Sequence, residues 1–207
     1  MEQLTAQTTK SLVLFLQNSY GIFIRPYITY RSLVKSSHAG QVFPLFLIIG
    51  VYFFFAGVIR HGLHPFIVAK SGIKISAAAF MTYAIVVFAI YSIGLLLKGK
   101  GNLKSISLAW AYSLWPTLIW FYVTSATYLL IPPPRTSSFQ GQLFSYLFIA
   151  LSLALFFWKG VLYYLTLRFG VQLDLRRIII ASTIIFPVGI GYSLLMYSLG
   201  IFRIPFI

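Results

Sequence analysis

The sequence predicts an all-α integral membrane protein, a bundle of five transmembrane helices with a short amphipathic N-terminal segment. Of its 207 residues, 59% are hydrophobic and 9% are charged, which leaves too few polar side chains to cover a soluble domain. Five apolar stretches are each long enough to cross a hydrocarbon core of about 30 Å as a helix. They are apolar on all sides, without the alternation typical of membrane β-strands.

Residues 1–40 are predicted to lie on the cytoplasmic face of the membrane. Their apolar residues recur at near-helical spacing, with basic residues nearby, which indicates one or two short amphipathic helices. Gly21 and Pro26 interrupt the pattern, so a loose basic tail is the alternative. The apolar positions are Leu12, Phe15, Leu16, Phe23, Tyr27 and Tyr30, and the basic ones are Lys10, Arg31 and Lys35.

Residues 41–207 are predicted to form the transmembrane domain. The expected spans are residues 41–59, 75–97, 106–130, 143–167 and 178–201. After the third span, Pro132 to Pro134 predict a stiff, extended start to an external loop.

The basic residues predict that the N-terminus is cytoplasmic and the C-terminus is outside. With this orientation, ten Lys and Arg residues lie on the inner side and five on the outer side, as the positive-inside rule requires. The inner set is Lys10, Arg25, Arg31, Lys35, Lys98, Lys100, Lys104, Arg168, Arg176 and Arg177, and the outer set is Arg60, Lys70, Lys74, Arg135 and Arg203.

Two prolines lie inside predicted spans and are expected to kink them. Pro116 would free the carbonyl of Tyr112, and Pro187 would free that of Thr183. Nearby hydroxyl groups, including that of Ser113, are expected to satisfy freed backbone groups. The kinks are interpreted as packing features that shape the bundle, and moving parts of a transporter are the alternative.

Lys159 is the remaining basic residue and the only ionisable side chain placed well inside a predicted span. Intramembrane charges are functional candidates by default. Lys159 is expected nearer the cytoplasmic end of the fourth span, where its long stem would carry the ammonium to the lipid headgroups. A substrate or anion site is the alternative.

Acid-base and metal chemistry have few candidate residues. The only carboxylates are Glu2 and Asp174, and Asp174 is expected to cap the last helix beside Arg176 and Arg177. His61 and His64 have no evident third ligand, and the chain has no cysteine. We therefore expect no catalytic residue, no metal, no cofactor and no enzymatic activity. The scattered basic residues favour anionic lipid headgroups over nucleic acid as a partner.

Three segments resemble the Yip family, five-span membrane proteins that interact with Rab-type GTPases in eukaryotes. The segments are RPYITYRSL at Arg25 to Leu33, LAWAYSLWPTL at Leu108 to Leu118, and Phe157 to Pro187, which begins FFWKGVLYYLTLRFG and closes in ASTIIFP. The chain lacks the long polar N-terminal region of eukaryotic members and its cytoplasmic loops are short. It is therefore similar to the shorter prokaryotic form, for which GTPase binding is not expected.

The leading functional hypothesis is a non-enzymatic Yip-like protein of membrane organisation or trafficking that acts through helix and lipid contacts. A small transporter or permease subunit that uses its kinked helices and Lys159 is the alternative. The expected partners are the lipid bilayer, other membrane proteins or further copies of the chain. Arg25 and Pro26 are expected to orient entry into the membrane, Tyr112, Pro116 and Pro187 to shape the bundle, and Lys159, Arg168, Arg176 and Arg177 to meet the inner headgroups.

Overall fold

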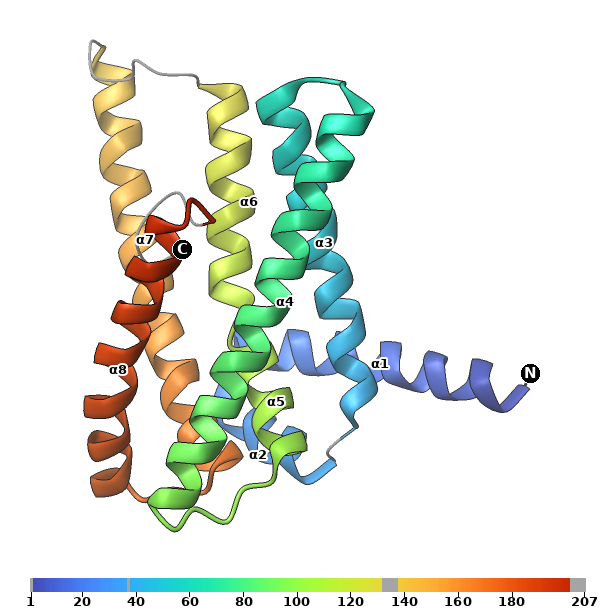
Figure 1. The fold of residues 1–207 in the computed structure, drawn as a ribbon, viewed down its shortest axis with the longest axis vertical. Coiled ribbons are helices and arrows are strands. Elements are labelled where there is room, and N and C mark those ends of the chain that lie inside the picture. The colour runs from blue at the N-terminus through green and yellow to red at the C-terminus, as the bar shows by residue number, and fades with distance from the viewer. Residues whose placement is uncertain (1, 37, 132–137, 202–207) are drawn as a thin grey trace.

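The computed structural model describes residues 2–36, 38–131 and 138–201 and is helical in all of its regular elements (Figure 1). The predicted loop at Pro132 to Pro134 lies outside the described residues. In chain order, the helices are α1 (Glu2–Ile24), α2 (Pro26–Ser36), the 3₁₀ turn η1 (Ala39–Gln41), α3 (Val42–His61), α4 (Pro65–Leu96), α5 (Leu103–Tyr112), α6 (Trp115–Leu130), α7 (Phe139–Leu165), the π-helical turn η2 (Thr166–Gly170) and α8 (Leu175–Ser198).

Five helical segments are long and apolar enough to cross a membrane, which confirms the predicted fold class. They cover residues 39–61, 65–96, 103–130, 139–170 and 175–198, and the third combines α5 and α6. The largest boundary difference is in the second, because α4 begins at Pro65 and not near residue 75. Pro65 fits the first turn of α4, because its missing N–H costs no hydrogen bond there. The residues from 65 to 74, which were expected to form a loop, are therefore helical.

The two intramembrane prolines lie in different places in their helices. Pro116 lies in the first turn of α6, after a break at Ser113 and Leu114, so the third span is two helices. Pro187 lies inside α8, which continues through it to Ser198. A proline is tolerated at a helix start, and there it favours a new helix over a kink.

The N-terminal segment forms two helices, and not the loose basic tail that was the alternative. Helix α1 lies crosswise to the bundle and its N-terminal end projects away from it (Figure 1). Arg25 separates α1 from α2, whose first residue is Pro26. The Arg25 carbonyl accepts hydrogen bonds from the backbone N–H of Thr29 at 3.1 Å and from its hydroxyl at 2.9 Å. A Cβ at Gly21 would lie 2.5 Å from Thr29 Oγ1, so glycine allows the two helices to approach here.

Several of the most completely buried side chains lie on α2, α5 and η2, which pack against one another. Tyr30, Leu33, Ile106, Leu108 and Leu167 are almost inaccessible there. Helices α7 and α8 have the least buried spans and present large apolar side chains along most of their length. The bundle is therefore packed tightly at one end and leaves extensive apolar surface for lipid or protein contacts.

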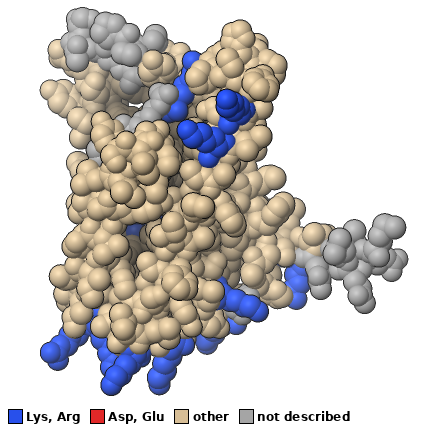
Figure 2. Space-filling model, in the orientation of Figure 1, with Lys and Arg blue, Asp and Glu red and all other residues tan. Residues whose placement is uncertain are grey.

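Basic side chains gather at the tightly packed end, with a smaller group near the opposite end (Figure 2). The first end contains the α4–α5 connection, η2 and the start of α8, and the second contains the α3–α4 turn (Figure 1). For the basic residues that the structure describes, this separation agrees with the two sets used in the positive-inside argument. Which end faces the cytoplasm remains a prediction.

Candidate functional site

The break between α5 and α6 leaves backbone carbonyls without the partners that a continuous helix would provide. Side chains occupy several of them. Ser113 Oγ donates a hydrogen bond to the Trp110 carbonyl at 2.7 Å, rather than to the Tyr112 carbonyl that Pro116 was expected to free. The Ser113 backbone N–H also donates to the carbonyls of Ala109 and Trp110. The break is thus a hydrogen-bonded junction within the third span.

Lys159 of α7 reaches this junction. Its Nζ donates to the Ser113 carbonyl oxygen at 2.8 Å and lies 4.9 Å from the centre of the Trp110 ring. The ammonium therefore has a charge-assisted hydrogen bond and a cation–π contact inside the bundle. The expected snorkelling conformation is not the one observed, because the Lys159 ammonium is hydrogen-bonded to a carbonyl at the helix break.

A second polar cluster joins α1, η1 and α5. Gln41 is completely buried, and its Oε1 accepts hydrogen bonds from Asn18 Nδ2 at 2.6 Å and from the Tyr112 hydroxyl at 2.8 Å. The Tyr112 ring also lies 6.2 Å from that of Phe15, centre to centre. Gln41 Nε2 has no hydrogen-bond partner among the described residues. Tyr112 therefore links the crosswise α1 to the third span.

Tyr30 and Thr166 share a backbone acceptor on α5. The Tyr30 hydroxyl donates to the Ala109 carbonyl at 3.1 Å, and Thr166 Oγ1 lies 3.4 Å from the same oxygen. Burial raises the pKa of the Tyr30 phenol well above its ordinary value. The neutral phenol thus ties α2 to the centre of the buried layer.

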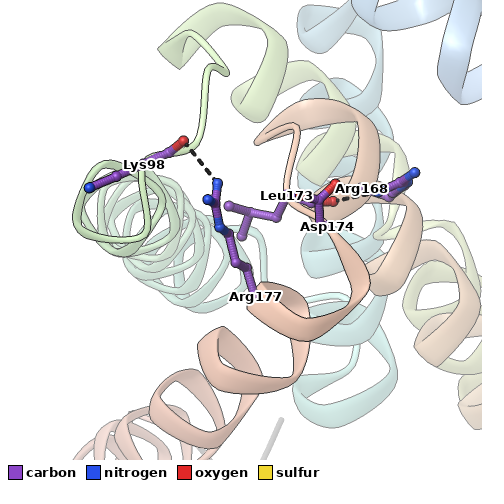
Figure 3. Close-up of polar contacts among 5 residues, drawn as sticks. All are labelled: Lys98, Arg168, Leu173, Asp174 and Arg177. Carbon is purple, nitrogen blue, oxygen red and sulfur yellow. Dashed lines mark hydrogen bonds and ion pairs between the residues drawn. The ribbon is translucent and has the colours of Figure 1, made fainter.

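Asp174 occupies the N-cap position of α8, but its side chain makes no capping hydrogen bond. Its Oδ1 instead lies 3.3 Å from Arg168 Nη1, and the same nitrogen donates to the Leu173 carbonyl at 3.0 Å (Figure 3). The position of Asp174 was therefore predicted correctly and its side-chain contact was not, because Arg168 lies within a π-helical turn that sequence spacing does not reveal. The carboxylate remains close to the positive end of the α8 dipole.

Arg176 and Arg177 lie in the first turn of α8, and both face the end of α4. Arg177 Nη1 approaches the Lys98 carbonyl oxygen at 3.4 Å (Figure 3). Together with Leu96, Leu97 and Ile180, these three basic residues line a shallow surface groove. Lys98, whose φ is 56°, ends the turn after α4 in a left-handed conformation.

The structure thus brings Tyr112, Pro116 and Lys159 close to one junction and places Arg168, Asp174, Arg176 and Arg177 near another. Pro187 and the Arg25–Pro26 pair belong to neither. Sequence reasoning missed Asn18, Gln41 and Thr166, although a glutamine at the start of a long apolar run was a usable signal.

Within the described ranges, no group of three His, Cys, Asp or Glu side chains could hold a metal ion.

The fold defines a multi-pass helical membrane protein with five spanning segments. Comparisons with family models, curated proteins and solved structures give no match. The number of spans is consistent with the Yip resemblance, and membership of that family remains a prediction.

Proposed function

We propose that this chain is a non-enzymatic, Yip-like membrane protein that organises the inner leaflet, with α1 as an interfacial helix. The observation that carries the proposal is the position of α1, which lies crosswise to the five spans in the half of the bundle that ends in the more basic group (Figures 1 and 2). An amphipathic helix in this position displaces headgroups on one side of the bilayer. Membrane trafficking is a process that requires such changes in membrane shape.

The surface of α1 supports an in-plane position. Phe15 and Ile22 are buried against the rest of the protein and lie along one face. Leu12, Leu16 and Tyr20, at four-residue spacing, form a neighbouring stripe and are at least half exposed. Because successive residues turn by about 100° around a helix, Lys10 and Gln17 fall on another side. One stripe therefore packs on the bundle, the next is suited to acyl chains, and the third is polar.

The test compares adjacent positions on α1 in the full chain. Because the sequence has no cysteine, Leu16→Cys and Gln17→Cys each provide a single labelling site for an environment-sensitive fluorophore. In vesicles of phosphatidylcholine and phosphatidylglycerol, we expect a lipid-attached quencher to act more strongly at position 16 and an aqueous quencher at position 17. Equal quenching at both positions would contradict the in-plane helix.

The effect on the membrane is measured separately. At equal protein density, we expect the unmodified chain to give smaller or more curved vesicles by cryo-electron microscopy than Leu16→Glu does. Gln17→Glu adds the same charge on the polar side of α1 and is the matched control. If Leu16→Glu leaves vesicle shape unchanged while the protein remains folded, the organising function is wrong.

A transporter remains the second candidate because Lys159 contacts a break in a spanning helix. Broken helices with charged groups near the break are typical of transporter binding sites. This function predicts anion or proton flux into vesicles loaded with chloride-sensitive or pH-sensitive dyes. The flux should depend on Lys159, and a dye signal equal to that of protein-free vesicles would argue against transport of these ions.

A further inference from the structure

We propose that the groove between the end of α4 and the start of α8 binds the headgroup of an anionic phospholipid. This inference deepens the proposed function and rests on its placement of the more basic end at the inner leaflet. The groove is lined by Leu96, Leu97, Lys98, Arg176, Arg177 and Ile180. Its lining thus divides into three cations and three aliphatic side chains, which matches the two chemical parts of a phospholipid.

The positive charge of the groove has no acidic side chain to neutralise it. Asp174 is the only carboxylate among the side chains that the structure describes, and it does not line the groove. Its Oδ1 faces Arg168, on the side of the α8 start away from Lys98 and Arg177 (Figure 3). A phosphate would therefore be the counter-ion of Lys98, Arg176 and Arg177.

The donors suit a phosphate. A guanidinium can donate two parallel hydrogen bonds to phosphate oxygens, and a lysine ammonium adds a mobile point charge. Arg176 and Arg177 are in the first turn of α8, where the helix dipole favours an anion. The 3.4 Å approach of Arg177 Nη1 to the Lys98 carbonyl joins the two walls of the groove.

The aliphatic part of the lining selects a lipid over free phosphate. Leu96 is 79% exposed and Ile180 is 43% exposed, and both belong to helices that continue into the spanning region. An acyl chain beside these residues would cover apolar surface while its phosphate remains at the basic end. Basic pockets between transmembrane helices at the cytoplasmic side bind anionic headgroups in this manner.

The test uses the full chain in detergent and measures bound lipid by native mass spectrometry. Phosphatidylglycerol and phosphatidylcholine are supplied in equal amounts, and the test variant is Lys98→Gln/Arg176→Gln/Arg177→Gln. The control, Arg31→Gln/Lys35→Gln/Lys104→Gln, removes three exposed basic residues that do not line the groove. Each near-surface cation contributes about fivefold to anionic lipid binding, so the test variant should lose phosphatidylglycerol preference on the order of 100-fold.

The control variant should keep most of the preference. Equal losses in the two variants, or no loss in the test variant, would overturn the groove as a binding site. If the triple variant does not fold, Arg176→Gln alone should lower the preference by about fivefold. Displacement of phosphatidylglycerol by an equal concentration of inorganic phosphate would indicate a free-phosphate site and would also overturn the proposal.

The outcome is separable from that of the proposed function. Failure of the groove would leave the quenching pattern of α1 and the Leu16→Glu effect on vesicle shape unchanged. If instead the α1 experiments fail but the chain still prefers phosphatidylglycerol, the proposed membrane-organising function is wrong and the lipid site in the groove is retained.

Discussion

Lys159 Nζ donates a hydrogen bond to the Ser113 carbonyl oxygen across 2.8 Å, from the fourth span to the break in the third. The two residues are far apart in the sequence, and each provides the hydrogen-bond partner that the other lacks. The Ser113 carbonyl at the helix break needs a hydrogen-bond donor, and the Lys159 ammonium inside the bundle needs a partner that stabilises its charge. The pair therefore fastens α7 to the junction between α5 and α6.

The Lys159–Ser113 contact predicts that Lys159→Met lowers stability. The substitution preserves an extended side chain but removes the charged hydrogen bond and the cation–π contact, at a cost of about 1.5 to 3 kcal/mol. We expect a lower Tm in detergent. Lys104→Met, at an exposed lysine near the start of α5, is the control and should leave the Tm almost unchanged. An unaltered Tm for Lys159→Met would mean that the ammonium does not stabilise the break.

The Gln41–Tyr112 contact predicts a non-additive pair of substitutions. Gln41→Leu removes the acceptor of Asn18 and of the Tyr112 hydroxyl and leaves the buried hydroxyl unpaired, which costs about 1 to 3 kcal/mol. Adding Tyr112→Phe removes that hydroxyl. We expect Gln41→Leu/Tyr112→Phe to be less destabilised than the sum of the single variants, as measured by thermal unfolding in a double-mutant cycle. Additive losses would show that the two side chains are not coupled.

The buried phenol of Tyr30 predicts a loss of stability at high pH. Its pKa is raised in the folded protein, so above the ordinary tyrosine pKa of about 10 the unfolded chain releases the proton first. The contribution of Tyr30 is fully present below that pH and is lost as the pH rises further. We expect Tyr30→Phe to weaken the alkaline decline in Tm relative to the unmodified chain.

Tyr27→Phe is the matched control for the alkaline measurement. Tyr27 is also on α2 and is 56% exposed, so the loss of its phenol should not change the slope of Tm against pH. Parallel slopes for Tyr30→Phe and Tyr27→Phe would contradict the assignment of alkaline sensitivity to Tyr30.

The sequence predicted those features that follow from local composition. Long apolar runs specified five spans, and the near-helical recurrence of Phe15 and its neighbours specified the N-terminal helices. The partners of Lys159 and Asp174 were not predictable in this way. Lys159 contacts a residue outside its own helix, in the third span, and Asp174 contacts Arg168, which lies within a π-helical turn. Both contacts depend on how helices pack and turn in three dimensions, which the spacing of residues along the chain does not encode.

The Arg168–Asp174 pair is expected to contribute little to stability, although it is the ion pair closest to the proposed groove. The two side chains are 41% and 78% exposed, so solvent screens their attraction. The wider basic surface is thus better suited to recognition of an anionic lipid than to holding the helices together. Hydrogen bonds to the Ala109 and Ser113 carbonyls, which are less exposed to solvent, hold the helices together instead.

The two intramembrane prolines supply the last prediction, in which the same substitution has opposite effects. Pro116 is buried in the first turn of α6, where proline is favourable, so Pro116→Ala should lose packing and backbone preorganisation. Pro187 is exposed inside α8, where proline removes an internal hydrogen bond. Pro187→Ala should restore a bond to the Thr183 carbonyl without disturbing a buried contact.

We therefore expect Pro116→Ala to lower the Tm in detergent by an amount equivalent to about 1 kcal/mol and Pro187→Ala to maintain or raise it. Circular dichroism would verify that both variants keep their helix content. Destabilisation by Pro187→Ala would show that this proline shapes the packing of α8. A stabilised Pro187→Ala variant with reduced ion flux would instead favour the transporter, because the lost flexibility would belong to its working cycle.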